Sequence, residues 1–203
     1  MHKEILSEQQ VELLPLLGKP SRSFGLVGGT AIALQIGHRR SIDFDLFSFK
    51  EFKNRDIQKK VESITRIEKV FVNKTGEYTF LSNGVKITFF NYPYKIEYKK
   101  NFEGIIKMPD LLTLAAMKAF ALGKRAKWKD YVDLYFIMKD FFSLKDICKK
   151  SEELFGVQFN EKLFRIQLTY LEDVNYEEEV EFLPGFEVDE KTVKEKLVEF
   201  SLG

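Results

Sequence analysis

Two adjacent glycines, Gly28 and Gly29, limit what this chain can fold into more than any other feature. They follow a short apolar run at 24–27, typical of a buried strand, and precede a helical pattern at 30–36. Glycine permits a tight strand-to-helix turn, and the free backbone N–H groups of a helix N-terminus bind phosphate. A tight turn without a ligand has the same pattern, so the glycines alone leave both interpretations open. The run lacks the third glycine of a dinucleotide-binding loop and the lysine of a P-loop.

Two aspartates, Asp43 and Asp45, follow the glycine turn by about one helix, within a predicted strand at 42–47. Alternate residues of a strand share a face, so both carboxylates point the same way. Mg²⁺ relieves the repulsion between such carboxylates and prefers carboxylate and phosphate oxygens. An exposed strand face is the alternative, but aspartate is depleted in strands. The spacing therefore favours a site for Mg²⁺ or Mn²⁺.

Charge and cysteine content restrict the class of protein. The 32 basic residues nearly balance the 31 acidic ones, which excludes a basic field over the whole protein. The run 118–129 holds five basic residues and no acid, so a local basic surface remains open. The single cysteine, Cys148, excludes a disulfide scaffold and is expected in the core. With no leader-like N-terminus and no membrane-length apolar run, we expect a cytoplasmic protein that does not bind membranes.

Hydrophobic periodicity predicts a mixed α/β lobe over 1–108 and a helical lobe over 109–203, or one continuous domain. The predicted strands lie at 24–27, 42–47, 66–74, 77–82, 85–92 and 105–108. The predicted helices lie at 7–17, 30–36, 54–64, 110–122, 128–139, 144–155, 161–171 and 190–202.

Local signals predict where several elements begin and end. Four polar residues are predicted to cap helices: Ser7, Asn54, Ser143 and Asn160. Pro109 is expected at the first position of a helix, and Gly37 just past the end of one. Gly18 and Pro20 are expected to end the first helix, and Asn83-Gly84 to form a two-residue hairpin turn.

The segment GGT at 28–30, followed by HRRSIDFDLF at 38–47, resembles the nucleotidyltransferases related to DNA polymerase beta. Three further segments are similar to the AbiEii/AbiGii-type nucleotidyltransferase toxin family of prokaryotic toxin–antitoxin and phage-defence systems: 85–94, 117–119 and KWKDYVDLY at 127–135. The resemblance covers roughly Phe24 to Met138. It implies an α+β fold with a polymerase-beta-like mixed β-sheet flanked by helices and a C-terminal helical lobe.

The resemblance also implies roles for the residues of the first two segments. Gly28, Gly29 and Thr30 would hold the phosphates of an NTP substrate. Asp43 and Asp45 would bind Mg²⁺ or Mn²⁺ and act in catalysis. Arg40 would contact the triphosphate or the acceptor.

The downstream segments would complete the catalytic set. Lys118 would neutralise the charge of the triphosphate or position the nucleotide. Asp130 would lie near the site as an acid or as a group that supports the residues contacting the substrate, with Asp133 as its companion. The chain departs from the wider pattern at Thr88, where such enzymes place a third carboxylate on a neighbouring strand. Because a hydroxyl is a poor general base, Asp130 is the best candidate for that role.

These features predict a Mg²⁺-dependent nucleotidyltransferase that moves an NMP from an NTP to an acceptor hydroxyl. The resemblance implies that this acceptor is an RNA end, such as that of tRNA, or a protein hydroxyl. The resemblance implies a toxin with a cognate antitoxin protein. Two alternatives remain open. One is a catalytically impaired NTP-binding or protein-interaction module that retains the nucleotidyltransferase fold, and the other is a structural partner protein without a ligand.

Overall fold

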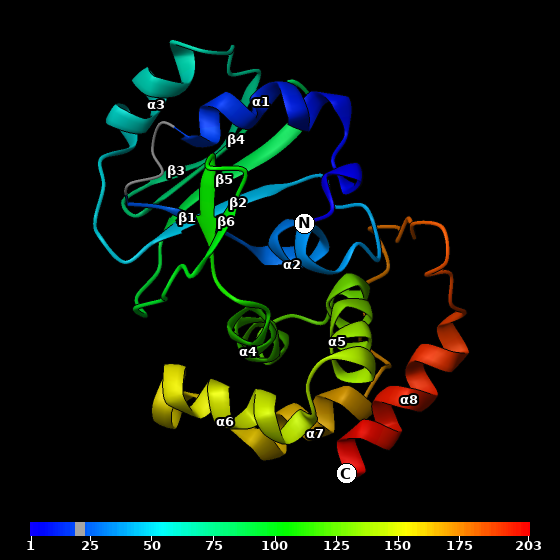
Figure 1. The fold of residues 1–203 in the computed structure, drawn as a ribbon. Coiled ribbons are helices and arrows are strands. Elements are labelled where there is room, and N and C mark those ends of the chain that lie inside the picture. The colour runs from blue at the N-terminus through cyan, green and yellow to red at the C-terminus, as the bar shows by residue number, and fades with distance from the viewer. Residues whose placement is uncertain (19–22) are drawn as a thin grey trace. The chain divides into compact units, whose positions relative to one another are not determined.

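The computed structural model describes residues 1–18 and 23–203. These residues form two compact units, Met1–Asp110 and Leu111–Gly203 (Figure 1). The boundary predicted from the sequence followed residue 108. Pro20, which was expected to end the first helix, lies outside the described residues.

A five-stranded mixed sheet forms the centre of the first unit, in the order β1-β2-β5-β4-β3. In this sheet, β2 and β5 pair in parallel, whereas the pairs β1–β2, β5–β4 and β4–β3 are antiparallel. A two-stranded sheet of β6 and β7 accompanies it. The strands are β1 (Gly25–Val27), β2 (Phe44–Ser48), β3 (Lys69–Lys74), β4 (Glu77–Ser82), β5 (Val85–Asn91), β6 (Lys100–Phe102) and β7 (Ile106–Met108). This arrangement confirms the predicted α+β class.

The two faces of the sheet differ because polar and apolar residues alternate along its central strands. On one face, Phe44 and Leu46 of β2 and Ile87 and Phe89 of β5 are fully buried. The Phe24 ring meets that of Phe89 edge to face, with the ring centroids 5.1 Å apart. The intervening residues of β2 and β5 are half-buried, so the second face is left for polar side chains.

The predicted hairpin turn is confirmed at Asn83 and Gly84, which join β4 to β5. Both have positive φ, 49° and 70°. Such angles match the twist of a two-residue hairpin, and asparagine and glycine adopt them most readily. The turn therefore fixes the register of β4 on β5, in which Ser82 pairs with Val85.

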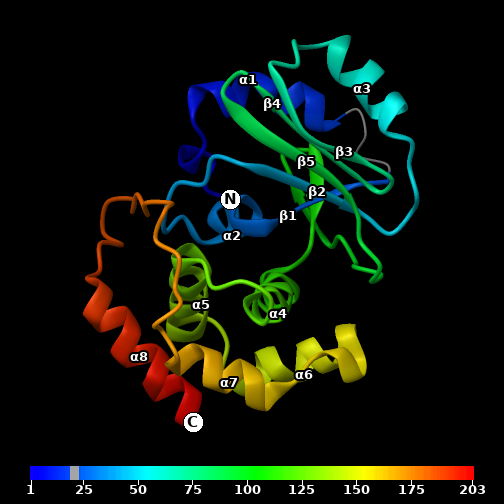
Figure 2. The same cartoon turned by 180° about the vertical axis from the view of Figure 1, so that it is seen from behind.

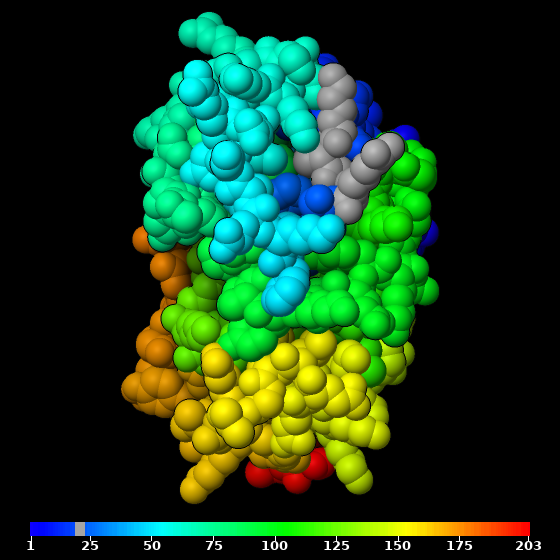
Figure 3. Space-filling model, turned by 90° about the vertical axis from the view of Figure 1, so that its left-hand side faces the viewer, coloured from blue at the N-terminus to red at the C-terminus, as the bar shows by residue number. Residues whose placement is uncertain are grey.

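Four helical segments accompany the sheet: η1 (Lys3–Ile5), α1 (Glu8–Gly18), α2 (Gly28–Ile36) and α3 (Asn54–Glu62). α1 and α3 lie along one side of the sheet (Figures 1 and 2). Figure 3 shows the face that includes α3, in cyan. In α3, Ile57 and Val61 are buried and the residues between them are more open to solvent. Gly37 ends α2 in the left-handed conformation, as predicted.

Several local predictions in this unit are wrong; β3, for example, begins at Lys69 rather than at residue 66. α2 begins at Gly28 rather than at residue 30, so the glycines form its first turn. β2 begins at Phe44, which places Asp43 just before the strand. Asn54 is the first residue of α3 and not its cap. Its amide instead donates to Asn73 Oδ1 and to the carbonyl oxygens of Lys74 and Glu77, because the β3–β4 hairpin offers it three acceptors.

The second unit is helical and consists of α4 (Leu111–Leu122), α5 (Trp128–Asp140), α6 (Leu144–Phe155), η2 (Gly156–Gln158), α7 (Glu161–Thr169) and α8 (Glu190–Leu202). α4 packs against α5, α6 and α7, and α8 packs against α5 and α7. Ser143 and Asn160 cap α6 and α7, as predicted. Pro109 is not the first residue of a helix, because α4 begins at Leu111.

The structure also bears on two other predictions, that Cys148 lies in the core and that the chain has no apolar run of membrane length. Cys148 is 2% exposed, and burial raises the pKa of its thiol to about 12, as fits a core residue. Within residues 1–18 and 23–203, no helix combines the length and apolar character that a membrane span requires.

Candidate active site

The glycine turn and the Asp45 carboxylate meet at the junction of β1 and α2. Gly28 has a φ of +72°, a conformation that L-residues rarely adopt. A Cβ atom on Gly28 would lie 2.5 Å from Asp45 Oδ2, so the carboxylate occupies the space of the absent side chain. Because Val27 pairs with Asp45 across the β1–β2 ladder, this contact follows from strand register. Both requirements at position 28, conformation and space, call for glycine.

The N-terminus of α2 has backbone N–H groups that no capping side chain occupies. Its N-cap residue is Val27, whose side chain has no polar atom and makes no capping hydrogen bond. The first N–H groups of a helix need an acceptor from outside the helix and carry partial positive charge. A phosphate group supplies both an acceptor and negative charge. The turn at Gly28-Gly29 therefore has the character of an anion site beside a carboxylate.

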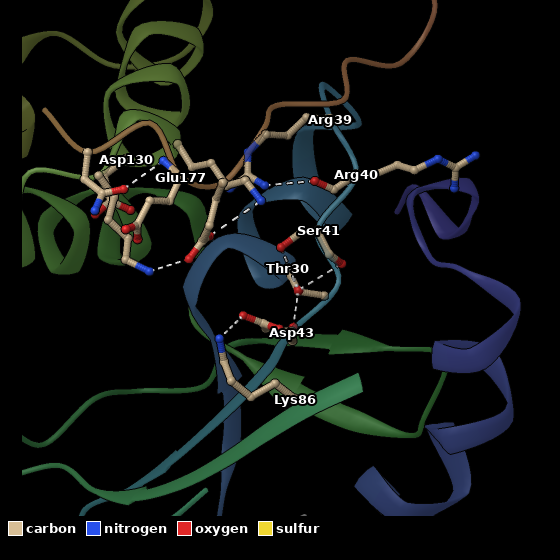
Figure 4. Close-up of polar contacts among 12 residues, drawn as sticks. Thr30, Arg39, Arg40, Ser41, Asp43, Lys86, Asp130 and Glu177 are labelled. Carbon is tan, nitrogen blue, oxygen red and sulfur yellow. Dashed lines mark hydrogen bonds and ion pairs between the residues drawn. The ribbon is translucent and has the colours of Figure 1, made fainter. Parts of the chain in front are cut away.

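Thr30 fastens this helix to the segment that carries Asp43 (Figure 4). Its side chain is buried, and its hydroxyl donates to the carbonyl oxygen of Asp43 and lies 2.9 Å from Ser41 Oγ. The buried Gln10 of α1 donates to the carbonyl oxygen of Ser41 at 2.8 Å. The Thr30 hydroxyl is thus used to hold the segment that carries Asp43.

Two neighbouring arginines have different surroundings. Arg39 donates to the carbonyl oxygen of Arg40 at 2.9 Å, and its Nη2 lies 2.6 Å from where a Cβ on Gly29 would be. The Arg39 guanidinium is therefore at the glycine turn. Arg40, which the sequence singled out, extends toward η1, where its Nη1 donates to the carbonyl oxygen of Glu4 at 3.4 Å (Figure 4).

Lys86 of β5 forms an ion pair with Asp43, with 2.6 Å between Nζ and Oδ2 (Figure 4). Asp45 pairs with Thr88 in the parallel β2–β5 ladder, so the residue expected to be a third carboxylate lies level with Asp45. The Thr88 hydroxyl is 3.5 Å from that of Thr79 on β4. The neighbouring strand therefore supplies an ammonium and a hydroxyl where a third acid was sought.

The donor set fits one Mg²⁺ ion better than a self-sufficient metal centre. Among the described residues, no group of three or more His, Cys, Asp or Glu side chains is placed to hold a metal. Mg²⁺ is commonly held by only one or two carboxylates together with substrate phosphates and water. Asp43 and Asp45, next to the N-terminus of α2, match that pattern.

The residues predicted from the downstream segments lie together inside the helical unit. Lys118 Nζ of α4 is 2.7 Å from Asp130 Oδ1 and 2.9 Å from Asp133 Oδ2, both on α5. All three side chains are at most 5% exposed. Arg125 Nε lies 3.2 Å from the other Asp130 oxygen. The cluster joins two helices and balances two buried acids with two cations.

The rest of the basic run also has partners within that unit. Lys127 and Lys129 both pair with Glu178, and Lys124 lies over the Phe120 ring with Nζ 4.2 Å from the centroid. Much of the positive charge at 118–129 is therefore balanced by nearby acids. The local sequence showed the cations, but their acidic partners come from 130–133 and 178.

Sequence reasoning missed two residues of the site, Arg39 and Lys86. Arg39 was one of two adjacent arginines, and no local signal separated it from Arg40. Lys86 stands two residues before Thr88 on the same predicted strand, so alternation placed it on the same face as Thr88. That signal was present, but the partner of Lys86 depends on which strand lies beside β5.

Comparison with known proteins now defines the family. The model for the AbiEii family, described as nucleotidyl transferase AbiEii toxin of a type IV toxin–antitoxin system, matches residues 19–200. An uncharacterized protein of Aquifex aeolicus (strain VF5) is 34% identical over 186 residues, covering 87% of each chain.

Two solved structures share the fold. JHP933 from Helicobacter pylori has a TM-score of 0.60 at 17% identity, over 97% of this chain and 92% of its own. The nucleotidyltransferase toxin MenT4 from Mycobacterium tuberculosis has a TM-score of 0.62 at 12% identity, over 95% and 81%. The match to the family model over most of the sequence shows that the chain belongs to the AbiEii family of nucleotidyl transferase toxins.

Proposed function

We propose that this protein is a metal-dependent nucleotidyltransferase that moves an NMP from an NTP to a hydroxyl group of a cellular acceptor. The observation that carries the proposal is the contact between Asp45 and Gly28, which sets a carboxylate against the first turn of α2. A phosphate held by helix N–H groups and a metal held by Asp43 and Asp45 would then be neighbours. Membership of the family supports the same activity.

The reaction is an in-line substitution at the α-phosphorus. A bond forms between the acceptor oxygen and the α-phosphorus, the bond to the bridging α–β oxygen breaks, and pyrophosphate leaves with that electron pair. Mg²⁺ or Mn²⁺ held by Asp43 and Asp45 would neutralise the phosphate oxygens and favour ionisation of the attacking hydroxyl. Gly28 and Gly29 would hold the phosphates through their N–H groups, and the Arg39 guanidinium would add positive charge there.

The proton of the acceptor hydroxyl needs a base. Thr88, in the position expected for a carboxylate, has no basic form at neutral pH. We propose Asp130 for this role on the basis of the family; within the helical unit, Lys118 and Arg125 hold its carboxylate through the ion pairs described above.

Transfer of label tests the proposal directly. Each of the four α-³²P-NTPs is incubated with the full chain, Mg²⁺ or Mn²⁺, and total cellular RNA and protein. Asp43→Asn is expected to lose at least ~100-fold in labelling, because a metal ligand is removed. Asp56→Asn, which changes an exposed acid in α3 of the same unit, is the matched control and is expected to label normally.

The labelled product also identifies the acceptor. Label that ribonuclease removes indicates an RNA end, and label that protease removes indicates a protein hydroxyl. Because the basic run at 118–129 is largely paired with acids, the charge distribution of the helical unit does not favour RNA over protein. A cognate antitoxin protein is proposed as the cellular partner on the basis of the family.

A second candidate function is a nucleotide-binding module without transfer activity. Thr88 beside Asp45 and the Lys86–Asp43 ion pair favour it, because both reduce the negative charge available for metal catalysis. This candidate predicts that NTP raises the midpoint of thermal unfolding while no label is transferred. Stabilisation by NTP that is unchanged in Asp45→Asn would support it over the enzyme.

A further inference from the structure

The ion pair between Lys86 and Asp43 places a protein cation on a proposed metal ligand. Lys86 Nζ lies 2.6 Å from Asp43 Oδ2, and the two side chains are 40% and 30% exposed. Both residues belong to the α/β unit, and Figure 4 shows the lysine reaching from β5 toward the aspartate. Because this ammonium neutralises the carboxylate, a metal ion that binds Asp43 has to compete with it for the negative charge.

The contact between Lys86 and Asp43 follows from the register of β5 on β2. β5 runs parallel to β2, with Phe44 level with Ile87 and Asp45 level with Thr88. Lys86 and Thr88 alternate with buried residues, so they share the face of Asp45. The two acids and Lys86 carry a combined formal charge of −1. A site for a permanently bound Mg²⁺ needs more negative charge than this, whereas NTP phosphates bring their own.

We propose that Lys86 acts as a resident counter-cation that keeps metal off Asp43 until an NTP arrives. In the nucleotide-free protein its ammonium neutralises Asp43 and weakens metal binding by the protein alone. When the metal enters with the triphosphate, the phosphate oxygens become the new partners of the ammonium. Lys86 is thus a positioning residue that couples metal binding to substrate binding. This inference rests on the proposed function, since it takes Asp43 and Asp45 as metal ligands.

A simple surface ion pair is the competing explanation, because half-exposed pairs are common and stabilise proteins little. The two explanations differ in one measurable respect. If Asp43 is only a surface acid, its pair with Lys86 has no influence on metal affinity, whereas a counter-cation on a metal ligand competes with the metal. Removing one unit charge at a half-exposed site near the metal is large enough to change affinity by about tenfold.

Binding of Mn²⁺ to the full chain without nucleotide, followed by electron paramagnetic resonance of the free ion, measures this competition. Lys86→Met is expected to bind Mn²⁺ about tenfold more tightly than the unaltered protein. Lys86→Arg keeps the charge and is expected to bind like the unaltered protein. Lys74→Met is the matched control, because Lys74 forms a comparable ion pair with Glu77, at 3.0 Å, on the far strands of the same sheet.

The double variant Lys86→Met with Asp45→Asn shows where the ion binds, and it is expected to lose the gain. Repeating the titration with a non-hydrolysable NTP analogue is expected to raise Mn²⁺ affinity more in the unaltered protein than in Lys86→Met. Lys86→Gln replaces Lys86→Met if circular dichroism shows that the latter is unfolded.

A folded Lys86→Met or Lys86→Gln protein that binds Mn²⁺ no more tightly than the unaltered chain would overturn the inference. A gain that survives loss of Asp45 would overturn it as well, because the ion would then bind elsewhere. The readout needs no catalysis. If tighter binding is seen in a protein that transfers no label, the role of Lys86 stands and the proposed activity fails. If label is transferred but the affinity is unchanged, the reverse holds.

Discussion

Gly28 has a positive φ, and the Asp45 carboxylate occupies the space where its side chain would be. Gly84 shares the positive φ, but no atom lies within 4 Å of the place of its Cβ. Comparing the two glycines therefore distinguishes the cost of a left-handed backbone from the cost of a steric clash with a side chain. Position 28 is constrained by both, and position 84 by the backbone alone.

Gly28→Ala is expected to destabilise the protein more than Gly84→Ala. Left-handed backbone costs an ordinary residue about 1–3 kcal/mol in either variant. Only at position 28 must Asp45 also move, which should add roughly 1 kcal/mol or more. Unfolding in urea measures both values. Equal losses would mean that the Asp45 carboxylate is not held against the turn.

The two arginines give a second comparison at this scale. Arg39→Gln is expected to weaken binding of a non-hydrolysable NTP analogue by about ten- to 100-fold, because a charged hydrogen bond to phosphate contributes about 1.5–3 kcal/mol. Arg40→Gln should change it less than twofold, since Arg40 extends toward η1. Isothermal titration calorimetry on variants shown to be folded decides between them. Similar losses in both would contradict the assignment of Arg39 to the glycine turn.

At the scale of elements, the features that depend on a few neighbouring residues could be predicted from the sequence. The Asn83-Gly84 turn and the caps Ser143 and Asn160 depend on their own segments, and the structure confirms them. Asn54 was also read by a local rule, but the β3–β4 hairpin offers its amide three better partners. Neighbouring residues determine which hydrogen bonds a side chain such as that of Asn54 can make, and contacts with distant elements determine which of them form.

Some residues of the candidate site could likewise be predicted from neighbouring residues, and others could not. The glycines and the two aspartates were found because each motif is continuous in the chain. The partners of Asp43 and Gly29 were not, because Lys86 reaches Asp43 only through the parallel pairing of β2 with β5. Strand order between segments so far apart has no signal in a single sequence of this kind, and it must be read from the fold.

The buried ion pairs that join α4 to α5 lead to a prediction about stability. Lys118→Met would leave Asp130 and Asp133 buried without their shared cation, so it should destabilise the protein by about 3–5 kcal/mol. Lys124→Met removes an exposed lysine from the same run and should cost under about 1 kcal/mol. Denaturant unfolding measures both. A small effect of Lys118→Met would show that the cluster is not needed for stability.

For the whole molecule, the proposed toxin role predicts an effect on living cells. Induced expression of the unaltered protein is expected to arrest bacterial growth, because a nucleotidyltransferase acting on a common cellular acceptor would inactivate it. Asp43→Ala should allow growth, and Asp56→Ala should not. Colony counts after induction, at matched protein levels, check this. Equal growth with the unaltered protein and Asp43→Ala would contradict the toxin role.

The parallel pairing of β2 with β5 also determines when during folding this protein acquires its site. The β4–β5 hairpin closes over a two-residue turn, whereas Asp43 and Lys86 are 43 positions apart. Contacts between distant segments form slowly because a long loop must first close. We expect amide protons of β4 and β5 to be protected earlier than those of β2 in pulse-labelled hydrogen exchange during refolding. Simultaneous protection would show otherwise. Under the proposed toxin role, a newly made chain would then be inactive until β2 has paired with β5.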